Sequence, residues 1–343
     1  MPGGQSRAVV ACEIGLLASA HPDRSLLLQR YEIGLMSTTA EQPDILAPRL
    51  APDAGIFMCE ARPMLRACLD SGVRRIFFVA PTGPRLLTLP AVQLICRGSR
   101  IPAAALSADE LMLAPPCGLG SGALAVLVEP KPELGAFLAR SGVATCTLTA
   151  TAPEAVALQA LAIALALLAE VGAMPEAEAL LADLARLPAM LPAAVRAFDP
   201  EAAALAARLR GERYLIVTAP GSAWPVAHHF ALDTLEKRLR IRARPVHASD
   251  FFHGTLELVE PGVSLLLVKG EDALRPLAER VERFVPRYTD RLWTIDAAAA
   301  ELPGLAPQVR ALASPVVLAA LLGRVGAHLA PSGEPVPSPC VEA

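Results

Sequence analysis

Short apolar runs bounded by Gly or Pro alternate with longer Ala- and Leu-rich stretches along most of the chain. The short runs predict buried β-strands and the long stretches predict helices. This pattern gives eight strands, at 75–80, 104–106, 123–128 and 144–148 in the first half and at 214–218, 244–247, 263–268 and 292–295 in the second. Such alternation predicts an α/β fold with parallel sheets.

A helical block at 153–209 separates the two sets of strands. Its first stretch, 153–171, is interrupted by Glu154, Gln159 and Glu170, which favours a buried helix over a membrane span. Breaks are predicted where Gly or Pro interrupts the block. They fall at Gly172–Pro175, Leu187-Pro188, Leu191-Pro192 and Asp199-Pro200, and Asp199-Pro200-Glu201 also has the form of a helix start.

The two halves echo one another about 139 residues apart. Ile76–Gly83 and Leu215–Ser222 each read as a strand that runs into a Pro/Gly turn, and 105–109 parallels 246–250. Two copies of one α/β unit are therefore expected. Ligands of open α/β sheets bind at the carboxyl ends of the strands, so both turns are candidates for a binding cleft, although such a turn is also common as a purely structural feature.

A chain of 343 residues exceeds what one core usually holds, so two lobes are expected. The predicted organisation is an N-terminal leader or extension at 1–45, a first lobe at 46–185, a second lobe at 186–330 and a Pro-rich tail at 331–343. The apolar start at 8–18 resembles a signal peptide, but Glu13 interrupts it, and we expect no export. Met1 and Met36 both remain open as the start codon.

Composition narrows the range of partners. The formal net charge is −3 and the pI is about 6.1, which offers no basic field for nucleic acid. Arginines alternate with apolar residues over 238–244, as on the solvated face of an edge strand. The seven cysteines are odd in number and form no Cys-x-x-Cys pair, which argues against disulfides and against zinc. We therefore expect a cytoplasmic protein without a membrane span.

One stretch resembles a known family. Ala248-Ser249-Asp250-Phe251-Phe252-His253-Gly254, continuing through Glu257 and Glu260-Pro261-Gly262 to 275–280, is similar to the second lobe of sugar isomerase (SIS) proteins of the Amadori-product deglycase group. That group, of which fructoselysine phosphate deglycases are typical, is related to the isomerase half of glucosamine-6-phosphate synthase. Glu41-Gln42-Pro43 resembles the start of the same module, so the similarity spans about 36–330.

The resemblance implies two SIS lobes, each a parallel sheet flanked by helices in a three-layer, flavodoxin-like αβα arrangement. It implies a homodimer with clefts shared between chains, a sugar or amino-sugar ligand, and no metal or organic cofactor. Proteins of this kind interconvert aldose and ketose forms of sugar phosphates, or cleave ketoamines to an aldose phosphate and an amine. A Glu and the motif His transfer the protons.

Chemistry supports the same residues. Moving a proton between C1 and C2 of a sugar needs a base near each carbon, and a carboxylate beside an imidazole supplies this near neutral pH. His253 is the candidate acid/base, with two aromatic residues before it to exclude water and Gly254 after it to let the backbone approach a ligand. The predicted cleft residues are Thr82, Ser107, Ser222, Ser249, Asp250 and Gly254.

The position of the partner carboxylate departs from the family pattern. By the resemblance it lies sixteen residues before the motif His, which is Lys237 here, whereas Glu236 lies seventeen before it. Either one extra residue is accommodated or the acid is absent, because a one-residue shift rotates a helical side chain by about 100°. Glu236 is the candidate, against the alternative of an exposed surface acid.

The phosphate-binding features also depart from the family. Where the family has a hydroxyl-rich loop of the type Ser-x-Ser-Gly-x-Thr, this chain reads Val128-Glu129-Pro130-Lys131-Pro132-Glu133. The first-lobe glycine turn is reduced to Ala80-Pro81-Thr82-Gly83-Pro84, and the family's C-terminal lysine is not evident. Two acids would repel a phosphate and two prolines remove amides that could bind it. We therefore expect an atypical or non-phosphorylated substrate.

Three functions remain open. The first is an enzyme that deglycates or isomerises an Amadori compound, in either direction. The second is a catalytically degenerate SIS protein that binds or senses a sugar, or that partners an active paralogue. The third is a different chemistry on the same scaffold, since a fold does not fix a function.

Overall fold

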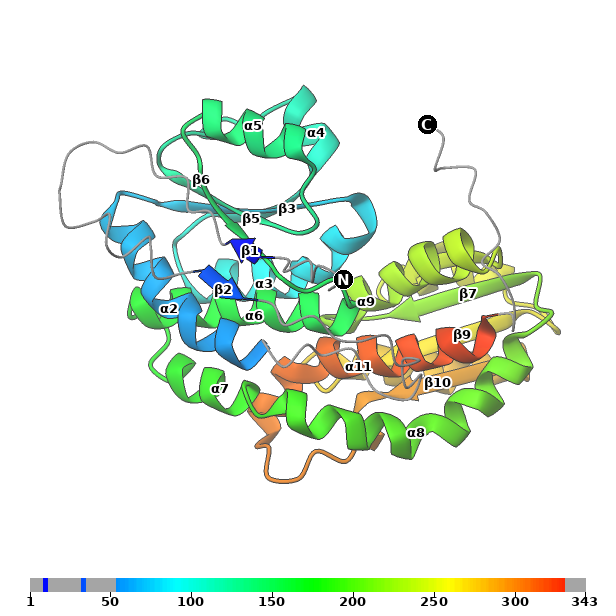
Figure 1. The fold of residues 1–343 in the computed structure, drawn as a ribbon. Helices are drawn as coiled ribbons and strands as arrows, with labels where there is room; N and C mark the ends of the chain where they lie inside the picture. Colours follow the sequence, from blue (N-terminus) through cyan, green and yellow to red (C-terminus); the bar gives the residue numbers. More distant parts are fainter. Residues whose placement is uncertain (1–8, 12–31, 35–53, 331–343) are drawn as a thin grey trace, which may run out of the picture.

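The computed structural model describes residues 9–11, 32–34 and 54–330. Two four-stranded parallel sheets form the two halves of the molecule (Figure 1). The first half runs α2 (Ala54–Asp70), β3 (Arg75–Ala80), α3 (Thr82–Gly98), β4 (Ala103–Ser107), α4 (Ala108–Leu113), β5 (Ala123–Leu127), α5 (Pro132–Arg140) and β6 (Ala144–Thr147). Its strand order is β4-β3-β5-β6.

The second half repeats this order as β8-β7-β9-β10. Its strands are β7 (Tyr214–Ala219), β8 (Arg242–His247), β9 (Ser264–Lys269) and β10 (Leu292–Asp296). Between them lie α9 (Ala223–His229), π-helical η1 (Phe230–Arg238) and η2 (Phe251–Thr255), η3 (Leu256–Leu258), α10 (Arg275–Phe284) and η4 (Val285–Arg287), and η5 (Ala297–Ala299) follows β10. All eight predicted strands are present, and the α/β class and the internal repeat are confirmed.

Each sheet is covered on both faces because successive strand residues point to opposite sides. In β3, Ile76 and Phe78 pack in the core shared with α2, α3 and α6, while Phe77 and Val79 pack against the side of α4 and α5. The second sheet is covered in the same way, by α9 and α11 on one face and by α10 and Phe251 on the other. The three-layer arrangement is thus present in both halves.

Long helices join the halves (Figure 1). They are α6 (Pro153–Glu170), α8 (Leu187–Leu209) and α11 (Pro307–Leu329), and the short helix α7 (Ala177–Leu184) lies between α6 and α8 in the sequence. Two of them, α6 and α11, are long and apolar enough to cross a membrane, but 83% and 72% of their apolar windows are buried inside the structure. Within the described residues they therefore serve as core helices, as predicted for 153–171.

Two of the predicted helix breaks are wrong. Helix α8 continues through Pro192 and Pro200, so Asp199-Pro200-Glu201 lies inside a helix and starts none. Packing against α11 holds this segment, because Asp199 bonds both Arg324 and His328 of that helix. These contacts compensate for the backbone hydrogen bonds that the two prolines cannot make. The expected breaks near 172–175 and 187 are present.

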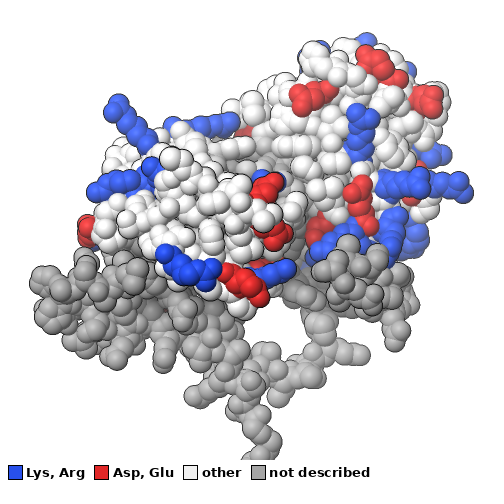
Figure 2. Space-filling model, turned by 90° about the horizontal axis from the view of Figure 1, so that it is seen from above, with Lys and Arg blue, Asp and Glu red and all other residues white. Residues whose placement is uncertain are grey.

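The prediction for the arginine-rich segment 238–244 is confirmed in part. In the arginine-rich segment, β8 is an edge strand with Arg242 and Arg244 exposed, as expected, whereas Arg238 ends a helix. On the face seen in Figure 2, positive and negative side chains are interspersed. The four cysteines whose side chains are described, Cys68, Cys96, Cys117 and Cys146, are free thiols.

Part of the proposed N-terminal extension is described, as the antiparallel pair β1 (Val9–Ala11) and β2 (Glu32–Gly34). The rest of 1–45, with Met36 and Glu41-Gln42-Pro43, lies outside the described residues, as does the tail at 331–343.

Candidate active site

A cavity of about 360 Å³ lies between the two halves, at the carboxyl ends of β3 and β5. This is where an open parallel sheet places ligands. The first half lines it with Pro81, Thr82, Gly83, Pro84, Leu87, Glu129, Thr151 and Pro153. The second half lines it with His229, Leu232, Asp233, Lys237 and Arg238.

The first turn of α3 forms one wall. Pro81 precedes the helix, and Thr82 and Gly83 are its first two residues. Helix N-termini carry free N–H groups and a partial positive charge, which favour anions and hydrogen-bond acceptors. Pro84 has no N–H, and the Arg85 N–H already donates to the Pro81 carbonyl at 3.0 Å. Of the predicted cleft residues, Thr82 is the one that lines this cavity.

Asp233 comes from the second half and closes the opposite wall. Its side chain is buried and pairs with Arg238 at 2.7 Å and with Lys237 at 3.5 Å. A Cβ atom placed on Gly83 would lie 3.3 Å from Asp233 Oδ1, so this carboxylate rests on the first-half turn. Sequence reasoning missed Asp233; its spacing of four residues from Lys237 was the available signal.

His229 is buried beside this carboxylate. Burial lowers the pKa of His229 from its ordinary value of 6.5 to about 4, although the charge of Asp233 acts in the opposite direction. The imidazole is therefore neutral at pH 7. It brings hydrogen-bonding capacity to the cavity wall without adding a charge.

Glu236 lies on the same helix but does not line the cavity. It is exposed, and its Oε1 accepts the N–H of Ala243 at 3.1 Å, where β8 begins. The segment Phe230–Arg238 is π-helical, and Arg240 after it has φ +58. A wide helical turn and a left-handed residue are ways to absorb an extra residue, which agrees with the spacing of seventeen residues between Glu236 and His253.

His253 lies elsewhere. It is exposed on η2, with φ −118 and ψ 56, and Gly254 follows with φ +119, a conformation that favours glycine. Neither lines the cavity of the same chain. The two aromatics before His253 anchor its loop: Phe251 is fully buried, and Phe252 packs on Phe284 and lies 4.0 Å beneath the Arg280 guanidinium.

The other predicted serines sit at strand ends outside the cavity. Ser249 Oγ lies 2.6 Å from His247 Nδ1 and donates to Asp250 Oδ1 at 3.1 Å. His247 in turn meets Trp224 edge-on. Ser107 is buried between β4 and α4. Ser222 is bonded to Asp272, as described below.

No group of His, Cys, Asp and Glu side chains with the geometry of a metal site occurs among the described residues. The cavity instead offers two hydroxyls, a neutral imidazole, two carboxylates and two cationic side chains. This set can hold a polyhydroxylated ligand through hydrogen bonds of both polarities.

Comparison with known proteins gives related sequences. No protein-family model matches the chain. Fructosamine deglycase FrlB of Bacillus subtilis is 24% identical over 300 residues, which cover 79% of this chain and 92% of the relative. A fructoselysine 6-phosphate deglycase of Escherichia coli O157:H7 is 32% identical over 128 residues, and an agropine synthesis conjugase of Rhizobium rhizogenes is 30% identical over 150 residues. The last two matches cover 36% and 42% of this chain and 38% and 42% of those relatives.

Solved structures share the fold. A Bacillus subtilis protein described as a phosphosugar isomerase superposes with a TM-score of 0.71 at 23% identity, over 81% of this chain and 94% of that one. The C-terminal domain of glucosamine-fructose-6-phosphate aminotransferase from Francisella tularensis gives a TM-score of 0.67 at 15% identity, over 85% and 97%. The predicted fold, two lobes that each hold a parallel sheet between helices, is confirmed.

Proposed function

Starting from the double-SIS fold and the sequence similarity to fructosamine deglycases, we propose that this protein is a sugar isomerase or deglycase acting on an amino-sugar or Amadori (ketoamine) compound. The observation that carries the proposal is the similarity to the deglycase over 79% of the chain. The polar cavity at the strand ends of the first lobe supports it. The substrate is atypical or non-phosphorylated, and no metal or organic cofactor takes part.

The reaction is a proton transfer between C1 and C2 of the sugar, which converts a ketoamine to the aldose imine; in the deglycating direction, water then hydrolyses the carbon–nitrogen bond and releases the amine. His253 acts as general acid/base and Glu236 as its partner. Thr82 contacts the ligand from the cavity wall, and Ser107, Ser249, Asp250 and Gly254 supply further contacts at strand and loop ends. Ser222 joins them only by exchanging its bond to Asp272 for one to the ligand. The same steps run toward deglycation or toward ketoamine formation, because a catalyst accelerates both directions; the similarity to a protein named as an agropine synthesis conjugase fits the synthetic direction.

A homodimer completes the site in this proposal. His253 is exposed and lies outside the cavity of its own chain, whereas Glu236 is adjacent to the cavity-lining Lys237. A second copy that presents its His253 loop to this cavity would assemble the acid and the base. The chain then works as a cytoplasmic dimer with two shared sites and with neither nucleic acid nor a membrane as partner.

One observation favours a second candidate, a degenerate SIS protein that binds or senses a sugar or partners an active paralogue. The Glu236 carboxylate is engaged by the Ala243 N–H and does not face the cavity. A protein that has lost the base would bind a sugar without converting it.

The test is amine release from a panel of fructosyl-amino acids, each with and without a 6-phosphate. Wild-type protein is compared with His253→Ala and with Glu257→Gln, an exposed acid on the adjacent turn. Release by wild type and by Glu257→Gln, lost in His253→Ala, supports the enzyme. If panel members bind specifically, but no amine is released and no ketoamine is formed, the result supports the binding protein.

A further inference from the structure

The second lobe contains an anion site that is already filled. At the end of β7, Gly221 and Ser222 form the turn that leads into α9. The Asp272 carboxylate accepts the Ser222 N–H at 2.7 Å and the Ser222 hydroxyl at 2.6 Å. Its other oxygen accepts the Leu274 N–H at 2.9 Å. Such backbone turns at strand ends bind anions, and here the anion is a side chain of the protein itself.

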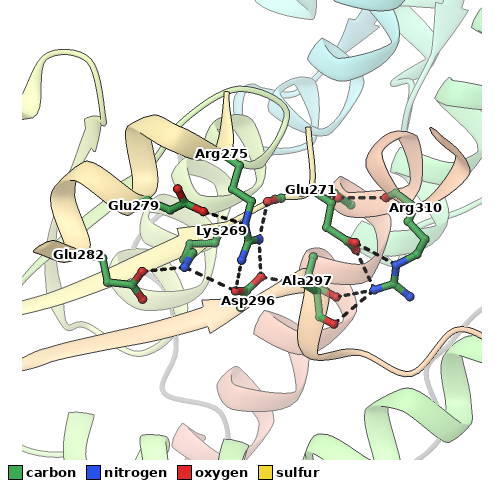
Figure 3. Close-up of polar contacts among 11 residues, drawn as sticks. Lys269, Glu271, Arg275, Glu279, Glu282, Asp296, Ala297 and Arg310 are labelled. Carbon is green, nitrogen blue, oxygen red and sulfur yellow. Dashed lines mark hydrogen bonds and ion pairs between the residues drawn. The ribbon is translucent and has the colours of Figure 1, made fainter. Parts of the chain in front are cut away.

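Gly221 shows how closely this carboxylate is held. Its φ is +57, and a Cβ atom there would lie 2.5 Å from Asp272 Oδ2. The adjoining strand ends are closed by ion pairs as well (Figure 3): Arg275 bonds Asp296 at 2.6 and 2.8 Å, and Arg310 bonds Glu271 at 2.9 Å through two nitrogens. The carboxylates Asp272, Asp296 and Glu271 at the strand ends of the second lobe are therefore all bonded by groups of the protein itself.

The corresponding turn of the first lobe borders the cavity, with the Asp233 carboxylate against Gly83 on one side. In the repeat, Thr82-Gly83 corresponds to Gly221-Ser222, and the loop after β5 corresponds to the loop after β9, which carries Asp272. The loop after β5 also carries an acid, Glu129, and this residue lines the cavity. Equivalent loops of the two lobes thus place a carboxylate beside equivalent turns. In the second lobe this carboxylate, Asp272, is hydrogen-bonded to the turn, whereas in the first lobe Glu129 lines the cavity.

The charges around Glu129 leave it available. The two cations that line the cavity, Lys237 and Arg238, both pair with Asp233. Glu129 is exposed, and across the described part of the chain no hydrogen bond or ion pair engages its carboxylate. Glu129 also has φ +48, in the left-handed region that is costly for a residue with a side chain. Pro130 and Pro132 beside it remove amides that could receive a phosphate.

We infer that Glu129 is a specificity-determining residue that excludes a phosphate group from the first-lobe turn and accepts hydrogen bonds from the hydroxyls of an unphosphorylated sugar. The inference deepens the proposed function and rests on it, because it assigns the sugar to the same cavity. A carboxylate accepts hydroxyl hydrogen bonds well but repels a dianion, and the second-lobe turn shows that a carboxylate fits beside such a turn.

The test is the ratio of dissociation constants for fructose and fructose 6-phosphate, measured by calorimetry at pH 7 and low ionic strength. Wild-type protein is compared with Glu129→Gln, which keeps the shape and removes the charge. Glu133→Gln is the matched control, because Glu133 is an exposed acid four residues after Glu129, in the first turn of α5, and does not line the cavity. Thermal unfolding of each variant checks that it is folded.

The expected result is that wild-type protein and Glu133→Gln prefer fructose, and that Glu129→Gln shifts the ratio about tenfold toward fructose 6-phosphate, the effect of removing one nearby like charge. Tighter binding of fructose 6-phosphate by wild type, an unchanged ratio in Glu129→Gln, or no binding of either sugar would overturn the inference. The proposed function is tested separately: preference for fructose without turnover contradicts only that function, and turnover restricted to phosphorylated compounds contradicts only this inference.

Discussion

The carboxylate of Asp233, on the second lobe, lies against Gly83, at the first turn of α3 in the first lobe. The contact makes the candidate site an inter-lobe site, since neither half supplies all of its walls. It also places a buried acid, held by Arg238 and Lys237, beside the helix N-terminus that would otherwise attract an anion. The chemistry of the cavity therefore depends on how the lobes pack.

Replacing Asp272 tests the internally filled turn. Asp272→Asn keeps the size of the side chain but weakens two charge-assisted hydrogen bonds to Ser222, so we expect a loss of about 1–3 kcal/mol in the free energy of unfolding. Urea denaturation measures this loss. Asp290→Asn, at an exposed acid, is the control and should change stability by less than about 0.5 kcal/mol. Equal stability of the two variants would show that the Asp272 contact contributes nothing.

His229 predicts a pH dependence of stability. Because burial lowers its pKa in the folded protein to about 4, the unfolded chain takes up a proton below about pH 6.5 while the folded chain does not. Stability should therefore fall as the pH is lowered from 6.5 toward 4. His229→Gln cannot take up this proton and should lose less stability over that interval, by about 1–3 kcal/mol.

The measurement is the melting temperature against pH for wild type, His229→Gln and His253→Gln. The last variant removes an exposed histidine and should follow the wild-type curve. Parallel curves for wild type and His229→Gln would contradict the account of a buried, neutral His229.

Subunit mixing tests the shared site. If Glu236 of one copy acts with His253 of the other, co-expressed His253→Ala and Glu236→Gln chains form mixed dimers with one intact site each. Random pairing then restores about a quarter of wild-type activity from two inactive variants. A mixture of His253→Ala with His253→Gln should restore none. Absence of recovery in the first mixture, with dimers present by light scattering, would place both residues in one chain or in no common site.

The sequence predicted best the elements that depend on residues close together in the chain. All eight strands follow from apolar runs bounded by Gly or Pro, and the repeat of Ile76–Gly83 in Leu215–Ser222 indicated both the lobe number and the strand-end turns. Prediction failed where distant contacts override local preference. Pro192 and Pro200 read as breaks, yet α8 continues because α11 is packed along it and Asp199 bonds Arg324.

The candidate site was only partly predictable. Thr82 was found because a strand-end turn implies a cleft, whereas Asp233 and His229 reach the cavity only through the packing of one lobe on the other. Ser222 was selected as a hydroxyl at the equivalent turn, but its partner Asp272 lies 50 residues further along the chain, and no local pattern reveals such a contact. The roles assigned to His253 and Glu236 remain predictions.

The most direct test of the central claim is the exchange of carbon-bound hydrogen. A fructosyl-amino acid is incubated with the protein in deuterium oxide, and deuterium at C1 and C2 of the sugar is followed by NMR, which detects proton transfer in either reaction direction. The account predicts incorporation by wild type that exceeds His253→Ala by about 100-fold or more, the usual contribution of a general acid/base. Incorporation that is absent from wild type, or equal in the two proteins, would contradict it.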